Sequence, residues 1–329
     1  MRAIVATRLG TPQDLTVQEL PTPVPGRGEV LVHVRAAAIN FPDILVIAGK
    51  YQVRPPLPFV PGKECAGVVA ALGPETSGFA VGEPVMVQVE YGAFAEAVAV
   101  PATHCYRMPP GIGFDAAAAV GIAYQTAHFA LVDRAQMKAG DKVLVTGATG
   151  SVGIAAMQLA KAFGCTVIAG VTTPAKAEVA RENGADHVVD LTVPDIRDRL
   201  RADVRDAVGG GVDVVVEIVG GEVFEAALRT LEFRGRLVVV GFTGGVIPAV
   251  KANYLLLKNI AVTGVNWSEY RDRDAAWVHR VQDEIFGLCV AGRLHVPVQA
   301  RFPLDDFAAG FAVLEDRRVR GKVVLTMDG

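Results

Sequence analysis

From residue 142 onward, short apolar runs alternate with longer segments that have the character of helices. The apolar runs include KVLVTG (142–147), TVIAGV (166–171), VDVVVEIVG (212–220) and RLVVVGF (236–242). Runs that are apolar on both faces are typical of parallel strands covered by helices on both sides. With right-handed crossovers, this order predicts a doubly wound nucleotide-binding sheet.

The remaining elements of this region fit the same alternation. SVGIAAMQLAKAFG (151–164) predicts a buried helix, and PAKAEVARENGA (174–185) predicts a helix with proline at its start and glycine at its end. Two further helices are predicted near 194–208 and 222–231, and two further strands at 187–190 and 261–266.

The two ends of the chain have a different pattern of apolar and turn-forming residues. Residues 1–110 contain short β-type runs such as EVLVHVRAAAI, separated by turn-rich segments such as RPPLPFVPG and MPPGIG. This spacing predicts an irregular antiparallel β domain. After residue 267 the chain predicts an amphipathic helix, and then a helix, a turn and a strand that ends in GKVVLTM.

The composition indicates a folded protein in a reducing environment. Of 329 residues, 51% are hydrophobic and 20% charged, and the formal net charge of −3 gives no general attraction for nucleic acid or anionic lipid. The four cysteines lie far apart without a C-x-x-C pair, which suits the cytoplasm. The run AAAAVGIAYQTAHFALV (116–132) is too short and polar for a membrane span, so we expect a buried helix and no membrane association.

VTGATGSVG places glycines in a G-x-x-G-x-x-G spacing between a predicted strand and a predicted helix. Such a loop lets the backbone approach a pyrophosphate at the positive end of the helix, although a tight turn without a ligand has the same composition. The residues expected at the phosphates are Ala148, Gly150, Ser151, Val152 and Gly153, with Gly147 before them.

The end of the second strand of this region indicates which dinucleotide binds. An NAD-binding site has an acidic residue about 20 positions after the first glycine. Here IAGVTTPAK has no acid, and Thr172, Thr173 and Lys176 offer hydroxyls, backbone donors and a positive charge. We therefore predict NADPH as the cofactor; the alternative is that Lys176 is an ordinary solvated lysine.

AAAINFPDILVIAGKYQ, PFVPGKECAGVV, GATGSVG and GKVVLTM, in this order, resemble the medium-chain dehydrogenase/reductase superfamily. The resemblance is to its zinc-free NADPH:quinone oxidoreductase branch, the zeta-crystallin-like group, and covers essentially the whole chain. It implies an α/β fold with a GroES-like irregular β domain and a Rossmann domain. The implied boundaries are 1–123 with 268–329 for the GroES-like domain, and 124–267 for the NADPH-binding domain.

The resemblance also addresses metal binding. Zinc alcohol dehydrogenases of this superfamily have a GHE motif whose histidine binds zinc, and this chain has Gly62-Lys63-Glu64 there. A protonated lysine has no lone pair and repels a divalent ion. The cysteine ligand of the zinc enzymes aligns near Asn40, Cys65 is best explained as a small buried hydrophobe, and no metal is expected.

Several residues resemble family positions around the nicotinamide, in a cleft expected between the two domains. Asn40 and Thr126 match residues beside the nicotinamide, and Tyr51 matches a cleft tyrosine that could orient or protonate a substrate. Each has a structural alternative: a turn for Asn40, and packing for Tyr51. We also expect Gly241, Phe242, Trp267 and Lys322 near the cofactor, with Arg320 a weaker candidate and His128 a buried or interface histidine.

Without a metal to polarise a carbonyl, the acceptor should already be electrophilic. The first expectation is an NADPH-dependent quinone reductase acting on a small molecule; the alternative is reduction of enones or enoyl thioesters such as acrylyl-CoA. A crystallin-like or RNA-binding protein is a third interpretation, which the interleaved acids and bases disfavour. Leu45, Leu191 and Glu217 depart from the family pattern and weaken any transfer of substrate preference. NIAVTGV, as an edge strand, predicts a homodimer.

Overall fold

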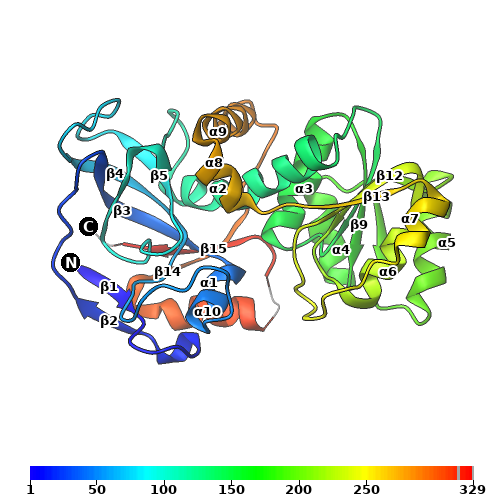
Figure 1. The fold of residues 1–329 in the computed structure, drawn as a ribbon, viewed down its shortest axis with the longest axis horizontal. Coiled ribbons are helices and arrows are strands. Elements are labelled where there is room, and N and C mark those ends of the chain that lie inside the picture. The colour runs from blue at the N-terminus through cyan, green and yellow to red at the C-terminus, as the bar shows by residue number, and fades with distance from the viewer. Residues whose placement is uncertain (317–318, 328–329) are drawn as a thin grey trace. The chain divides into compact units, whose positions relative to one another are not determined.

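The computed structural model describes residues 1–316 and 319–327. The chain divides into two compact units, each of which is described by itself (Figure 1). The first unit comprises Met1–Ile122, Arg271–Val290 and the chain from Val296 onward, and the second comprises Ala123–Tyr270 and Ala291–His295. Two of the boundaries fall within helices, α2 (Phe114–His128) and α8 (Trp267–Arg273).

The second unit is built on a six-stranded parallel sheet in the order β10-β9-β8-β11-β12-β13. Its strands are β8 (Lys142–Thr146), β9 (Thr166–Val171), β10 (His187–Asp190), β11 (Val212–Glu217), β12 (Leu231–Val239) and β13 (Ala261–Gly264). The order reverses between β8 and β11, which are neighbours although β9 and β10 lie between them in sequence. This is the doubly wound order, in which ligands bind at the carboxyl ends of the strands beside the reversal.

Helices of the second unit follow the predicted alternation. They are α3 (Ser151–Ala162), α4 (Pro174–Glu182), α5 (Ile196–Val208), α6 (Gly221–Arg229) and α7 (Ala252–Lys258). Helices α3 and α4 pack against β8, β9 and β10, and α5 and α6 pack against each other and against strands of the same sheet. The core between these layers is almost entirely aliphatic, with Phe224 as its aromatic member. The predicted doubly wound sheet is confirmed.

Two local features of this unit differ from the prediction. The helix expected over 116–132 is regular only to His128, after which a π-helix spans Phe129–Arg134. The sequence analysis also did not predict α7, whose residues Leu256 and Leu257 are 77% and 73% exposed. An apolar segment that lies on a surface has no amphipathic pattern that would reveal it as a helix.

The first unit contains a seven-stranded sheet and a two-stranded one. The larger has the order β14-β15-β3-β4-β5-β7, with β6 paired to β3, and its pairings are antiparallel apart from β14 with β15. Its strands are β3 (Glu29–Ile39), β4 (Glu64–Leu72), β5 (Pro84–Gln88), β6 (Ala97–Pro101), β7 (Cys105–Arg107), β14 (Val298–Pro303) and β15 (Lys322–Thr326). The two-stranded sheet joins β1 (Arg2–Val5) to β2 (Thr16–Glu19).

Helices α1 (Phe41–Ile47), α9 (Ala275–Val290) and α10 (Phe307–Glu315) complete the first unit. Its core combines residues of β3, β4 and β5 with Phe307 and Phe311 of α10, so the C-terminal segment is part of the core formed by the first hundred residues (Figure 1). Pairing of β15 with β3 makes the same connection through the backbone. This pairing brings Lys322, at the start of β15, towards Ile39 and Asn40 at the end of β3.

Candidate functional site

The glycine loop of the second unit follows β8 and begins α3. Gly147 has a φ of +62°, in the left-handed region that favours glycine. A Cβ atom added to Gly153 would lie 2.4 Å from the carbonyl oxygen of Gly147, so only glycine allows the helix to lie this close to the loop. Gly150 is the N-cap of α3, and Ser151 and Val152 form its first turn, where backbone N–H groups lack partners within the helix.

Glu217 supports the neighbouring loop at the end of β11. Its carboxylate accepts hydrogen bonds from the hydroxyl of Thr146 at 3.1 Å and from the backbone N–H of Gly220 at 2.9 Å. Burial raises the pKa of Glu217, whereas the donors from Gly220, Val219 and Thr146 lower it. Since Thr146 directly precedes the glycine loop, these bonds join the two loops on either side of the reversal in strand order.

The residues predicted at the ribose end of the dinucleotide lie together after β9. Thr173 is the N-cap of α4, and its hydroxyl accepts a hydrogen bond from the backbone N–H of Lys176 at 3.2 Å. The ammonium group of Lys176 donates to the hydroxyl of Thr172, also at 3.2 Å. A lysine and two hydroxyls, with no acid from Thr172 to Lys176, suit a phosphate group.

Gly241 and Phe242 follow β12 in a partly exposed loop. The ring of Phe242 lies beside Gly220, where an added Cβ atom would be 3.4 Å from Phe242 Cδ1. The structure thus brings the loop after β12 together with the loop that Glu217 holds. Ala148 is buried, and its backbone N–H donates to the carbonyl of Gly170 at 3.3 Å.

Trp267 contacts helix α2 at the residue that precedes Thr126. The indole N–H of Trp267 donates to the side-chain oxygen of Gln125, the residue before Thr126, at 2.5 Å. Trp267 is 6% exposed, and Thr126 is also buried. His128 packs with its ring edge towards Phe129 and Phe163, with centroid separations of 6.0 and 6.2 Å, as a buried histidine would.

Asn40 lies in the first unit, in a buried polar cluster with Glu64 and Lys322. Its amide nitrogen donates to Glu64 Oε1 at 3.0 Å and to the carbonyl of Ala38 at 3.1 Å, and its amide oxygen accepts from Lys322 Nζ at 2.6 Å. Lys322 also pairs with Glu64 at 2.6 Å and is 2% exposed. Both amide hydrogens of Asn40 and two of the three ammonium hydrogens of Lys322 are therefore used inside the unit.

This placement bears on the roles predicted for Asn40 and Lys322. The cluster is closed by the backbone N–H of Ile122, which donates to the second oxygen of Glu64 at 2.8 Å. The remaining acceptor capacity of Asn40 is one lone pair on its amide oxygen. Contact of either residue with a cofactor stays a prediction, and the observed bonds favour a positioning role. Arg320 lies outside the cluster, and its backbone N–H donates to Gln299 at 2.6 Å.

Asp43 caps the helix that begins beside this cluster. Its Oδ2 accepts from the backbone N–H of Asn40 at 2.7 Å, and its own backbone N–H donates to the backbone carbonyl of Asn40 at 3.0 Å. Its Oδ1 is buried and, among the described residues, has no hydrogen-bond partner. Burial raises the pKa of Asp43 to about 7, against the lowering effects of Lys63, the Asn40 N–H and Lys322.

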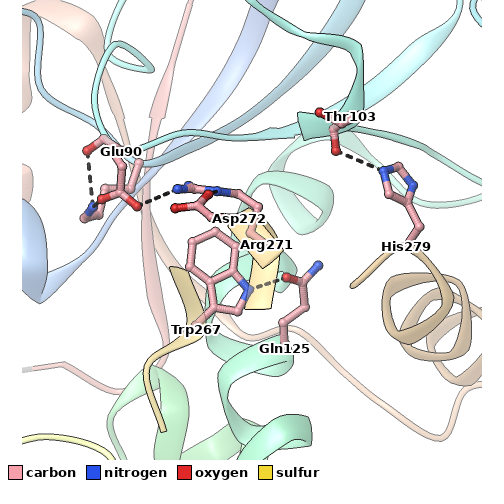
Figure 2. Close-up of polar contacts among 8 residues, drawn as sticks. Glu90, Thr103, Gln125, Trp267, Arg271, Asp272 and His279 are labelled. Atoms are coloured by element: carbon pink, nitrogen blue, oxygen red, sulfur yellow. Dashed lines mark hydrogen bonds and ion pairs between the residues drawn. The ribbon is translucent and has the colours of Figure 1, made fainter. Parts of the chain in front are cut away.

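Lys63 belongs to a second polar cluster of the first unit, in which Lys63 and Arg271 are buried and Tyr51 and Glu90 are partly buried. Its ammonium nitrogen lies 2.6 Å from Glu90 Oε2 and 4.5 Å from the centre of the Tyr51 ring. The other oxygen of Glu90 accepts from Arg271 at 2.8 Å, and Arg271 also pairs with Asp272 at 2.8 Å (Figure 2). Two cations thus share one carboxylate that is largely withdrawn from solvent.

Comparison with known proteins places this geometry in a family. Residues 26–110 match the family described as alcohol dehydrogenase GroES-like domain, and residues 151–281 match the family described as zinc-binding dehydrogenase. Quinone oxidoreductase-like protein 2 of Mus musculus is 37% identical over 99% of this chain and 92% of its own. The chain belongs to the medium-chain dehydrogenase/reductase family.

Solved structures of this family superpose on the whole chain. Escherichia coli quinone oxidoreductase complexed with NADPH has a TM-score of 0.91 at 29% identity, covering 99% of this chain and 100% of the other. A mycobacterial protein complexed with NADPH has a TM-score of 0.92 at 32% identity, with the same coverage. The predicted GroES-like and Rossmann architecture and the predicted family are confirmed, and the chain is an oxidoreductase of this family.

In this medium-chain dehydrogenase/reductase, Lys63, at the position of the zinc-binding histidine of the zinc-dependent relatives, and its neighbour Glu64 each form an ion pair with another residue of the chain. Lys63 pairs with Glu90, and Glu64 pairs with Lys322. Within residues 1–316 and 319–327, no three side chains of His, Cys, Asp or Glu come together as a metal-binding group. The cysteines Cys65 and Cys105 are buried, and burial raises the pKa of each thiol. None of the described helices has the length and apolarity to cross a bilayer.

Three of the residues described above were not singled out as functional by the sequence analysis. Glu90 follows a buried strand and Arg271 lies in the charged segment SEYRDRD, so each resembles an ordinary surface charge in the sequence. They are 181 positions apart, and no local spacing could have paired them. Glu217 was noted only as a departure from the family pattern, yet a carboxylate at the end of an apolar strand beside the strand-order reversal is a detectable signal.

Proposed function

We propose that this protein is an NADPH-dependent quinone oxidoreductase that works without a metal ion. The observation that carries the proposal is the buried Lys63, which stands at the family's metal-ligand position with its ammonium group on Glu90 and Tyr51. A site without a Lewis acid requires an acceptor that is already electrophilic, and a quinone is such an acceptor. The names of the relatives in mouse and Escherichia coli support the same choice of acceptor.

Residues of the second unit fit a phosphorylated dinucleotide. Gly147 and Gly153 leave the space in which the loop backbone can approach a pyrophosphate, and the first turn of α3 supplies N–H donors. Thr172, Thr173 and Lys176 would hold the 2′-phosphate through hydroxyls, a backbone donor and a positive charge. NADPH complexes of the Escherichia coli and mycobacterial relatives support this assignment.

The nicotinamide end is assigned to a second group of residues. We expect Gly241 and Phe242 to border the carboxamide and Trp267 to contribute an aromatic wall. Asn40, Thr126 and Tyr51 are expected nearby, with Asn40 and Lys322 acting through the hydrogen bonds that hold their cluster together. In this proposal the chain orients the reactants and supplies hydrogen-bond donors, which is the principal contribution of the protein when a cofactor carries the redox chemistry.

The proposed reaction has a simple balance. NADPH supplies a hydride, so that NADPH, a proton and a quinone become NADP⁺ and a quinol. The hydride brings two electrons to the acceptor, and negative charge develops on a carbonyl oxygen. A donor placed at that oxygen lowers the barrier, and the proton that completes the quinol comes from solvent.

Steady-state kinetics with several acceptors tests the proposed substrate class. We expect kcat/KM to be highest for 1,4-benzoquinone or 9,10-phenanthrenequinone with NADPH, and lower with NADH. A small enone and crotonyl-CoA represent the alternative, reduction of an activated carbon–carbon double bond. A kcat/KM for the thioester far above that for every quinone would reject the quinone assignment and favour the alternative.

We also propose a homodimer formed through β13. This strand is last in the sheet order, so among the described strands one of its edges has no partner. Leu256 and Leu257 of α7 and Phe233 of β12 are at least 69% exposed in the same unit. An unpaired strand edge and exposed apolar side chains together favour association of two copies about a two-fold axis. A cytoplasmic location stays a prediction.

A further inference from the structure

Lys63 is held on every side by specific partners. It follows Gly62, directly precedes β4, and is 2% exposed. Its ammonium group donates to Glu90 Oε2 at 2.6 Å and to the carbonyl oxygen of Glu90 at 3.2 Å. Its remaining neighbour is the Tyr51 ring, whose centre lies 4.5 Å away. A buried ammonium group is costly unless its donors are all satisfied, and here two oxygens and an aromatic face do so.

Tyr51 is anchored by its ring and not by its hydroxyl. The ring packs against the hydrophobic core of the first unit, and one face carries the Lys63 cation. Within the described part of the chain, no group forms a hydrogen bond with the Tyr51 hydroxyl. Tyr51 is half-buried, and its hydroxyl is not one of the buried side-chain atoms, so it is open to solvent on a ring that is fixed in place and is available to donate to a ligand.

We propose that Lys63 is a positioning residue that fixes the ring of Tyr51, so that the Tyr51 hydroxyl donates a hydrogen bond to the carbonyl oxygen of the acceptor. This inference rests on the proposed function and extends it by naming the group that meets the developing negative charge. Glu90 contributes to the same positioning, because it forms an ion pair with the ammonium group of Lys63. Arg271 in turn forms an ion pair with Glu90.

The electrostatic surroundings favour a hydrogen bond over a proton transfer. Burial raises the pKa of Tyr51 to about 12, with further raising by Glu90 and Asp43 and a lowering effect of Arg271. Together with Lys63, these are the charged groups that face the phenol. A hydroxyl with this pKa keeps its proton throughout the neutral range, so it stabilises an oxyanion without becoming one.

A double-mutant cycle tests the inference with Lys63→Met, Tyr51→Phe and the pair of substitutions, measured as kcat/KM for 1,4-benzoquinone. Losing the cation–π contact should lower kcat/KM about three- to tenfold in the wild-type background, and less than about twofold when the hydroxyl is already absent. The KM for NADPH should stay within about twofold, because NADPH binding is assigned to other residues. Equal losses in both backgrounds, or no loss from Lys63→Met, would overturn the inference.

Control variants distinguish a loss of Tyr51 positioning from a loss of folding. Lys50→Met removes an exposed lysine next to Tyr51 and should leave kcat/KM unchanged. Lys63→Gln keeps a donor for Glu90 without the charge; it replaces Lys63→Met in the cycle if circular dichroism shows that the Met variant is unfolded.

Failure of the proposed function would look different, since the wild type would then oxidise NADPH with none of the acceptors. In that case the same cycle is measured as the Kd of hydroquinone in the presence of NADP⁺, and additive effects or an absence of binding would overturn the inference.

Discussion

Asp43 is a buried carboxyl group whose pKa is raised well above that of the free side chain. It lies at the third position of α1, 1% exposed, between the lysines of the two clusters. Its carboxyl group caps the helix through one oxygen, whereas the other oxygen has no hydrogen-bond partner within the described residues. The positive charges of Lys63 and Lys322 compensate only part of the burial, and the pKa stays raised.

This raised pKa predicts how stability depends on pH. The folded state keeps the proton of Asp43 up to a pKa of about 7, whereas the unfolded chain releases it near the ordinary value of 3.8. Between these values the free energy of unfolding should fall as pH rises, by about 1.4 kcal/mol per unit from this group alone, and then level off. In Asp43→Asn this contribution should vanish, so the variant gains stability relative to the wild type from pH 4 to 7 in urea unfolding.

The exposed Asp283→Asn serves as a control and should keep the wild-type pH dependence. A constant difference between Asp43→Asn and wild type across this range would show that Asp43 is already ionised in the folded protein. Asn at this position can still accept the hydrogen bond from the backbone N–H of Asn40, so a lost helix cap would not account for a difference in stability between the variant and the wild type.

At the scale of single residues, the sequence indicates the chemistry of a side chain but seldom which other residues it contacts. The positive charge of Lys63 was enough to disfavour a metal ligand at that position. Its pairing with Glu90 was not predictable, because the two residues are 27 positions apart and belong to different turns of an irregular domain. Lys322 is 282 positions from Asn40, and only the β15–β3 pairing brings them together.

At the scale of elements, β13 and α7 determine the proposed association of two copies. We expect light scattering at micromolar concentration to give twice the chain mass of 34.6 kDa. Leu256→Asp with Leu257→Asp should shift this mass towards that of a monomer, because burying the new charges in an interface would be costly. Val24→Asp, which changes an 87% exposed residue of the first unit, is the control and should keep the dimer. A monomeric wild type would contradict the proposal.

Elements were predicted best where burial imposed a regular pattern. The strands at 166–171 and 187–190 have the predicted bounds, since each is an apolar run closed by turn residues. The π-helix at Phe129–Arg134 and helix α7 were missed for opposite reasons. The π-helix continues an apolar helical pattern without interruption, whereas α7 exposes Leu256 and Leu257 and contacts the core only through the partly buried Tyr254 and Leu255.

At the scale of the whole molecule, the fold of each unit followed from the sequence, whereas the acceptor did not. Alternation of buried strands and helices fixed the doubly wound sheet, and the glycine loop fixed the end of the sheet where a dinucleotide binds. The proposed choice of acceptor depends on side chains in loops, and loops have no periodicity that could be read from sequence. The central claim is therefore chemical: hydride transfer from NADPH to a quinone with no metal ion.

NADPH oxidation by chelator-treated protein tests this claim most directly. The protein is dialysed against EDTA and mixed with NADPH and 1,4-benzoquinone, and the absorbance at about 340 nm is followed against a blank without protein. We expect the treated protein to oxidise NADPH as fast as the untreated protein, with no gain on adding zinc. A treated protein that is inactive until zinc is restored, or an untreated protein no faster than the blank, would contradict the account.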